Sequence, residues 1–401
     1  MWTPTDVSLN EYKDALLAGV REVKIRVTAL DANLNKISDD ADITDDTVEG
    51  TVYVDADRAT RRTCQLRIID TNGKYTPRGA SYESYGTNSF FYWDKTFKVE
   101  YGLRIGGQYY YVTLGIFMVD RVEVVAERGA AVINIDGSDL WKKITFSEWT
   151  ASETIAHTET INYTINKILI DAYPTAKIIL DPLTSRASNL LGIPFYASLG
   201  DNRGERLLSL LEEWSIDIFV DRNGNFVTRD KTQAPYTGGT SAPDFEFTAG
   251  ENAVMLGVVK SQSGDTIKNH ILVYNDKPST SARFAEAFDG NGTSTSSKYY
   301  TNSGSPTSIE NLGDRVMIVK AQTLASTEAC LARAKDELAK NIFIEEEIRL
   351  PAIVNPLFDA YDTISIVETN SMIQDSYQLK AFDVPMQGSR QEMVVKKTRA
   401  L

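Results

Sequence analysis

The sequence has very few of the residues on which metal and nucleophilic chemistry depends. Two histidines, His157 and His270, and two cysteines, Cys64 and Cys330, occur in 401 residues. Two cysteines cannot form a disulfide framework or a four-thiolate zinc site. Neither histidine lies in a His-x-x-x-His or His-Glu-x-x-His pattern, and no orienting partner stands near either one in the sequence. We therefore expect no enzymatic activity, no catalytic, cofactor-binding or metal-binding residues, and no cofactor.

Long apolar runs and an excess of positive charge are also missing. The longest apolar run, 114–119, has the length of a strand, so no membrane-spanning segment is expected. Asp6, Glu11 and Asp14 precede any apolar run, which is unlike a secretory signal peptide. The 42 basic residues are outnumbered by 55 acidic ones, giving a formal net charge of −13. Because DNA-binding surfaces neutralise phosphates with Lys and Arg, specific nucleic-acid binding is not expected.

Glycine and proline are too scarce, at 25 and 12 residues, for a collagen-like or low-complexity chain. Hydrophobic residues make up 42% and charged residues 24%, which are ordinary values for a folded, soluble protein. At about 150 residues per domain, this length predicts two to three domains.

Two Asp- and Asn-rich segments begin like calcium loops but lack the full pattern. Segment 38–46 holds five aspartates without the glycine and glutamate of an EF-hand. Segment 221–225 is followed by Phe226 where that loop needs glycine, and no glutamate ends it. We interpret the first as a solvated loop. The second contains Asn223-Gly224, which supplies the positive φ angles of a tight hairpin turn.

The pattern of the first 148 residues is dominated by strands. Residues 1–21 predict a helical segment with Tyr12 and Leu16 on one face. From 22 to 148, short β-branched and aromatic segments follow one another without a helix, and 97–105 alternates most regularly. Asn72-Gly73 fits a further hairpin turn. Such a series indicates an antiparallel barrel or sandwich, so 22–148 is expected to form a first β-barrel-like domain.

Residues 149–232 predict a small α/β insertion. Apolar residues at helical spacing indicate helices over 161–172 and 204–214, and 178–180 is expected to be a short buried strand. The second helix leads into a hairpin of strands 216–220 and 226–229, which we expect to complete the first barrel.

A Pro-, Gly- and Thr-rich linker at 233–243 precedes a second β-barrel-like domain at 244–400. This domain includes an excursion at 277–340. Its first part, 277–311, is rich in Ser, Thr, Gly and Asn and predicts a long exposed loop, since neither GxGxxG nor GxxxxGK is present. Its second part predicts a helix over 323–340. The fold class is therefore α+β, mainly antiparallel β.

Several stretches resemble the minor tail or tail-hub proteins of long-tailed bacteriophages. In 49–124, Asp57-Arg58-Ala59-Thr60-Arg61-Arg62-Thr63 leads into a strand, and an Asp70-x-x-Gly73 turn follows. Gly115-Ile116-Phe117 then precedes Asp120-Arg121-Val122. The helix-to-hairpin stretch 207–229 and the closing order of helix, proline-containing approach 351–362 and final strands are also similar to this family. The resemblance covers about residues 22–400.

The resemblance implies a structural virion protein with two similar β-barrels per chain. A homotrimer would form a pseudo-sixfold ring that adapts a sixfold tail tube to a threefold tip and surrounds the DNA channel. The same hub fold is shared with the spike cores of contractile secretion machines. The implied partners are tail tube or distal tail proteins and a central spike, tip or tape-measure protein. The implied location is the phage tail tip or baseplate, after assembly in the bacterial host cytoplasm.

The chain differs from this family pattern at both ends. It has an extra N-terminal helix, and the sequence ends soon after the last expected strands. We therefore expect no fused lysin, peptidase or receptor-binding tail of the kind that some relatives carry.

Two other functions remain open from the residues alone. A non-catalytic glycan-binding module or a carbohydrate-active tail module would use aromatic residues and paired carboxylates, and the chain has 19 tyrosines and five tryptophans. However, Tyr109, Tyr110 and Tyr111 should alternate between the two sides of one strand. Segment 345–347, Glu-Glu-Glu, should alternate in the same way and cannot bring two facing carboxylates together.

Overall fold

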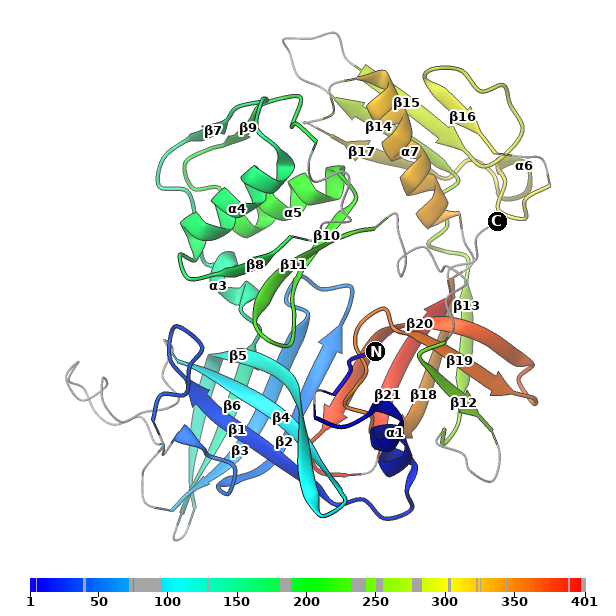
Figure 1. Cartoon of the computed structure of the whole chain (residues 1–401). Helices are drawn as coiled ribbons and strands as arrows, with labels where there is room; N and C mark the ends of the chain where they lie inside the picture. Colours follow the sequence, from blue (N-terminus) through cyan, green and yellow to red (C-terminus); the bar gives the residue numbers. More distant parts are fainter. Residues whose placement is uncertain are drawn as a thin grey trace.

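The alternating segments form a sheet that runs through both halves of the chain (Figure 1). The computed structural model describes residues 1–4, 6–38, 41–71, 75, 95–127, 130–180, 189–231, 243–249, 255–275, 283–301, 304–321, 324, 326–342, 345–388 and 390–397. Within these residues, twelve strands make up this large sheet: β1 (Val23–Leu30), β2 (Thr47–Asp55), β3 (Arg62–Asp70), β4 (Thr96–Ile105), β5 (Gln108–Glu127), β6 (Ala130–Ser138), β12 (Phe245–Thr248), β13 (Val259–Ser263), β18 (Glu345–Ile353), β19 (Thr363–Glu368), β20 (Ile373–Pro385) and β21 (Arg390–Lys397).

The strand order of the large sheet is β1-β4-β5-β6-β3-β2-β20-β21-β18-β13, and β19 pairs with both β20 and β12. Neighbours along this order are antiparallel, whereas β12 and β19 are parallel. The α+β, mainly antiparallel fold class is therefore confirmed.

The two β modules are not closed barrels. Strand β2 pairs with β20 from Thr51 opposite Pro385 to Asp55 opposite Ala381, which joins the two halves into one open sheet. One hydrophobic core serves both halves, because Val52, Phe97 and Phe247 belong to the same buried cluster. Two-residue alternation identifies a strand but not the strand with which its edge pairs, and this is why the barrel expectation was wrong.

A second core lies in the α/β part of the chain. It is built by α3 (Trp141–Thr145), α4 (Ile161–Ala172) and α5 (Arg203–Glu213) with β7 (Glu153–Ile155), β8 (Lys177–Ile179), β9 (Phe195–Ala197), β10 (Ile216–Val220) and β11 (Asn225–Asp230). The expected helices and hairpin are confirmed here. Strand β11 pairs with β8 and, among the described strands, with none of the large sheet, so the hairpin does not complete a barrel. The short strand expected to be buried is half exposed at Ile179.

The segment expected to be one long loop contributes strands instead. β15 (Arg283–Phe288) and β16 (Lys298–Tyr300) join β14 (His270–Asn275) and β17 (Val316–Lys320), in the order β16-β15-β14-β17, to form what we call the small sheet. The short helix α6 (Ile309–Leu312) precedes β17. Ala285 and Ala287 alternate inward and give the strand a packing face that the Ser- and Gly-rich composition conceals. Residues 276–282 lie outside the described part of the chain.

The predicted helix at the end of the excursion is α7 (Thr327–Asn341), which covers one face of the small sheet. Its opposite side reaches the turn between α5 and β10. Arg333, which is almost fully buried, donates from Nη1 to the Ser215 hydroxyl at 2.8 Å and pairs with Glu337 at 3.0 Å. Helix α7 thus lies between the small sheet and the α/β part (Figure 1).

The N-terminal segment forms the expected helix, α1 (Leu9–Leu17). A capping box stabilises its first turn. The Ser8 side chain accepts a hydrogen bond from the Glu11 amide, and the Glu11 carboxylate accepts one from the Ser8 amide. Tyr12 and Leu16 pack against Leu103 on β4. None of the described helices is long and apolar enough to cross a membrane. The predicted Asn72-Gly73 turn and the linker residues 233–242 lie outside the described residues.

Candidate functional site

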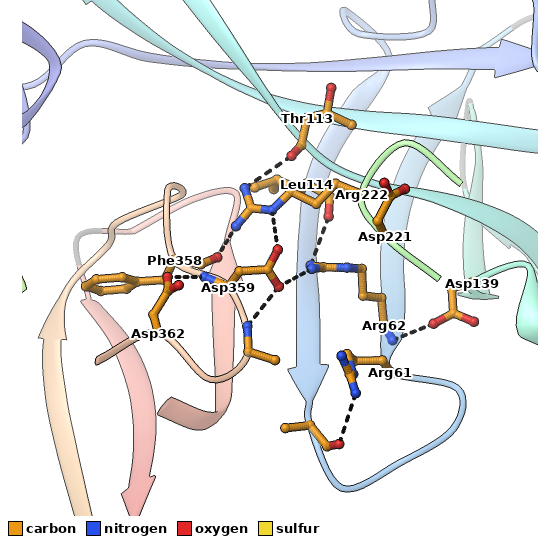
Figure 2. A network of polar contacts seen from close by, with 12 residues as sticks. Arg61, Arg62, Thr113, Leu114, Asp139, Asp221, Arg222, Phe358, Asp359 and Asp362 are labelled. Atoms are coloured by element: carbon orange, nitrogen blue, oxygen red, sulfur yellow. Dashed lines mark hydrogen bonds and ion pairs between the residues drawn. The ribbon is translucent and has the colours of Figure 1, made fainter. Parts of the chain in front are cut away.

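Buried charged residues gather where the two halves of the large sheet meet the α/β part. Arg62 is the first residue of β3 and Arg61 directly precedes it, and Arg222 lies in the turn between β10 and β11. Asp359 belongs to the loop between β18 and β19. The three arginines are only 1–2% exposed, so their charges need partners inside the protein. Figure 2 shows how their side chains converge.

Asp359 bridges two of these arginines. Its Oδ1 lies 2.5 Å from Arg62 Nη2, and its Oδ2 lies 3.5 Å from Arg222 Nε. Burial alone would raise the pKa of Asp359, but the two guanidinium groups outweigh burial and hold the pKa well below its ordinary value of 3.8. The carboxylate is therefore charged at neutral pH and compensates the buried cations.

Arg222 also donates hydrogen bonds to three backbone carbonyl groups. It donates from Nη1 to Pro356 O at 2.6 Å and to Thr113 O at 3.3 Å, and from Nη2 to Phe358 O. Burial lowers the pKa of Arg222 to about 10, so it stays protonated at neutral pH. One side chain at the tip of a hairpin thus contacts β5 and the β18–β19 loop at once (Figure 2).

Arg61 and Arg62 extend the network toward α3 and β10. Arg61 Nη2 donates to Asp217 at 2.7 Å, and its guanidinium lies 4.0 Å from the centre of the Phe219 ring. The Arg62 amide donates to Asp139 Oδ2 at 2.9 Å, while Asp139 Oδ1 accepts from the Trp141 amide at 3.0 Å. These contacts connect β3 with the start of α3 and with β10. We call the contacts of Arg61, Arg62, Arg222, Asp139, Asp217 and Asp359 the arginine network.

The contacts of this network hold separate segments of the chain together. Its carboxylates are engaged by arginines or backbone amides of other segments. Among the described residues, no group of three or more His, Cys, Asp or Glu side chains could hold a metal ion. The network fixes the position of the hairpin tip and the β18–β19 loop against the large sheet.

The network predicts an unusual dependence of stability on pH. Burial raises the pKa of Asp139 from 3.8 to about 6, despite the amides and arginines near it. A carboxyl whose pKa is higher in the folded state takes up a proton on folding, so stability falls as pH rises from about 4 to about 6. We expect a higher urea midpoint at pH 5 than at pH 7, and a weaker difference in Asp139→Asn. A wild-type midpoint that rises from pH 5 to pH 7 would contradict this.

Sequence reasoning found only part of this site. Arg61 and Arg62 belong to the stretch that resembles the tail family, and the structure places both in the network. Arg222 and Asp359 were missed. Arg222 stands between Asp221 and Asn223 in a polar turn, where an arginine is ordinarily exposed, and no local pattern indicates its burial.

The other candidate residues are used in structural contacts. His270 Nδ1 lies 2.9 Å from Asp314 Oδ1, a partner 44 residues away that the sequence did not indicate. Asp221 Oδ1 accepts from the Asn223 and Asn225 amides at 2.8 and 2.9 Å, as in a hairpin turn. The interpretation of this segment as a turn is therefore confirmed.

The residues that a carbohydrate site would use are separated. Tyr109 donates to Glu22 at 2.6 Å, and the Tyr111 ring stacks on Arg26. Glu346 is buried and accepts from Tyr377 at 2.6 Å, whereas Glu347 pairs with Arg349 at 2.8 Å. None of these contacts brings two carboxylates together.

Comparison with solved structures identifies the fold. The tail protein of Neisseria meningitidis MC58 superposes with a TM-score of 0.59 at 11% identity, over 93% of this chain and 97% of that one. The prophage MuSo2 43 kDa tail protein of Shewanella oneidensis gives 0.57 at 10% identity, over 93% and 98%. This chain has a bacteriophage tail-protein fold. The resemblance seen in the sequence is thus confirmed for the fold.

A similar fold occurs in a VgrG-containing complex. A chain of the half-lidded Francisella PdpA–VgrG complex gives a TM-score of 0.53 at 10% identity, with 94% of this chain covering 58% of that one. No protein-family model and no curated protein matches the sequence. The fold is thus found in both phage tail proteins and a VgrG-containing complex.

Proposed function

We propose that this chain is a structural hub at the tail tip or baseplate of a phage-like particle. Three copies would form a ring that adapts a sixfold tail tube to a threefold tip and surrounds the DNA channel. The observation that supports this most strongly is the match over nearly the full length of two phage tail proteins, 97% and 98% of their chains. A structural role is consistent with the arginine network, whose buried arginines form ion pairs between separate segments of the chain.

The arginine network suits this role. A ring subunit has to keep its shape while it is held by the tube on one side and the tip on the other. The partly buried carboxylate of Asp359 links distant segments by bridging the buried Arg62 and Arg222. It can rearrange only by leaving these buried charges unpaired.

The proposed location can be tested with isolated tail tubes. Gold-labelled chain added to tubes that lack it should bind at one end only. Labelling along the whole tube, or no labelling, would contradict the proposal. As a check on the alternative function, a glycan array should give no saturable binding. Saturable binding by a monomeric chain would favour a glycan-binding module.

We also expect the hub not to bind DNA. The chain carries a formal net charge of −13, and three copies would carry three times that charge. Like charges repel the phosphates, so a channel of this kind lets DNA slide without holding it. A gel-shift titration with double-stranded DNA at low salt should show weak or no binding. Submicromolar binding that weakens steeply with salt would contradict a passive channel.

A further inference from the structure

The sequence contains three Asn-Gly pairs: Asn72-Gly73, Asn223-Gly224 and Asn291-Gly292. The first lies outside the described residues, whereas the structure places the other two in different surroundings. Asparagine followed by glycine is a reactive pair, because glycine has no side chain to keep its backbone nitrogen away from the asparagine side-chain carbonyl. The two described pairs therefore show how the fold controls this reactivity within one chain.

The reaction at such a pair needs only water. The glycine nitrogen attacks the side-chain carbonyl carbon Cγ of asparagine and forms a C–N bond, while the bond between Cγ and Nδ2 breaks. The proton of the glycine amide leaves with the side-chain nitrogen as ammonia, and a five-membered imide remains. Water then opens this ring at either carbonyl carbon. The sum is asparagine plus water giving aspartate, or its isomer isoaspartate, plus ammonia.

The Asn223-Gly224 pair is held by the turn between β10 and β11. Gly224 is buried, and its amide donates to Asp221 O at 3.1 Å. The Asp221 carboxylate accepts from the Asn223 amide at 2.8 Å. The neighbouring Arg222 is only 1% exposed and anchors the same turn in the arginine network. Attack by the Gly224 nitrogen on Asn223 thus requires the turn to open.

The Asn291-Gly292 pair lies open to solvent. Both residues are exposed, in the loop between β15 and β16. Among the described residues, none forms a hydrogen bond with the Asn291 side chain or with the Gly292 amide. The Asn291 backbone amide donates to Glu310 Oε1 at 3.0 Å, but this contact does not engage the reacting atoms. The Gly292 nitrogen can therefore approach Asn291 Cγ without an opening of the fold.

The packing of the loop requires glycine at position 292. A Cβ atom there would lie 2.3 Å from the Tyr300 ring, which is closer than real Cβ atoms approach. Tyr300 is itself stacked on Phe288, with the ring centres 4.7 Å apart. Because Tyr300 leaves no room for a side chain at 292, the fold keeps a reactive pair in an exposed loop.

We propose that Asn291 is a site of spontaneous deamidation, and that its conversion loosens the loop between β15 and β16. This proposal is independent of the role at the tail tip. The isoaspartate product adds a methylene group to the backbone between residues 291 and 292. The hydrogen bond from residue 291 to Glu310 and the contact of Gly292 with Tyr300 then no longer fit together.

The new carboxylate acts in the same direction. The hydrogen bond from the Asn291 amide holds the pKa of Glu310 below its ordinary value, so Glu310 is charged at neutral pH. Either product places a second negative charge beside it. Like charges repel, and the contact that ties the loop to α6 is weakened.

Mass spectrometry of the ageing protein tests the site. The wild-type chain is incubated at neutral pH and digested, and the peptides that contain Asn291 and Asn223 are followed separately as an NH2 group is replaced by OH. Asn291 should convert at least about tenfold faster than Asn223, because opening the turn breaks the hydrogen bonds that Asp221 accepts. Equal rates, or faster conversion of Asn223, would overturn the proposal.

The unfolded chain is the matched control. In concentrated urea neither pair has folded neighbours, so the two asparagines should convert at similar rates. A rate difference that persists in urea would show that flanking sequence, and not the fold, protects Asn223. If Asn291 stayed intact in the folded chain over the time in which it converts in urea, the proposed site would be wrong.

Hydrogen exchange measures the loosening. In the aged wild-type chain, exchange should increase over residues 289–301. It should stay unchanged in equally aged Asn291→Gln, whose longer side chain forms a ring much more slowly. Asn291→Asp carries the new charge from the start and should show a smaller increase without ageing. Converted wild-type chain with unchanged exchange would overturn the loosening, and equal melting temperatures of the fresh proteins would show that both variants fold.

Discussion

Asp359→Ala should destabilise the protein by about 3–4 kcal/mol, toward the lower end of the range for removing one partner of a fully buried ion pair, because the Asp359 side chain is 28% exposed. Asp359 is the carboxylate shared by Arg62 and Arg222, which are only 1–2% exposed. Without it, two guanidinium groups remain buried with a deficit of negative charge. The free energy of unfolding, measured in urea by fluorescence of the buried Trp141 near the network, should report the loss.

Asp45→Ala is the matched control for this variant. Asp45 also pairs with a cation, Lys24 at 3.8 Å, but its side chain is 94% exposed. Exposed ion pairs contribute about 0–1 kcal/mol, so this variant should unfold at nearly the wild-type urea concentration. Equal, small effects of both substitutions would show that the arginine network does not hold the segments together.

Acid should weaken the network in the same direction as Asp359→Ala. The pKa of Asp359 is lower in the folded state than its ordinary value of 3.8. Its contribution is therefore complete above that value and is lost as pH falls below it. The pH dependence of Asp139 runs the opposite way and at higher pH, because burial raises its pKa to about 6. The combined contribution of these two carboxyl groups should consequently be greatest between the two ranges, near pH 4.

Arg333→Ala should be the second most damaging substitution, at about 2–4 kcal/mol. Arg333 is 4% exposed, pairs with Glu337 at 3.0 Å and donates to Ser215 at 2.8 Å. Its loss leaves the buried Glu337 with its ion pair to Lys340 and removes a contact between α7 and the α/β part. Hydrogen exchange should increase in α7 and around the α5–β10 turn.

The matched control is Arg349→Ala. Arg349 pairs with Glu347 at 2.8 Å, which is as short as the Arg333 contacts, but its side chain is 70% exposed. It should change the free energy of unfolding by less than about 1 kcal/mol. If Arg333→Ala raised hydrogen exchange uniformly over the chain, the contact would serve general stability and not the link between α7 and the α/β part.

The sequence predicted the individual elements well where their pattern is strong and local. Alternation over 97–105 corresponds to β4, and the helical spacing of Ile161, Ile165 and Ile168 corresponds to α4. Strand pairing was not predictable in this way. The pairing of β2 with β20 joins residues more than 300 positions apart, and the sequence of neither strand indicates its partner.

The small sheet shows where composition misleads. Segment 277–311 is rich in Ser, Gly, Thr and Asn, which predicts a loop, yet β15 and β16 lie within it. Asp289 explains part of the order. It is fully buried and accepts hydrogen bonds from the hydroxyl groups of Thr301, Ser305 and Thr307. Polar residues can thus order a segment when their hydroxyl groups donate hydrogen bonds to one buried carboxylate. The burial of that carboxylate depends on tertiary structure.

The candidate site was predictable only in part for a related reason. An arginine in a sequence can lie either in a buried network or on the surface. Arg222 is buried because the whole β10–β11 hairpin lies against β5. The lack of His and Cys patterns, by contrast, is visible directly in the sequence and predicts no metal site.

The number of copies of this chain at the tail tip tests the central proposal most directly. A cryo-electron microscopy reconstruction of the assembled tail, calculated without imposed symmetry, should show three copies in a ring below the sixfold tube. One, two or six copies, or a position along the tube, would contradict the trimeric hub.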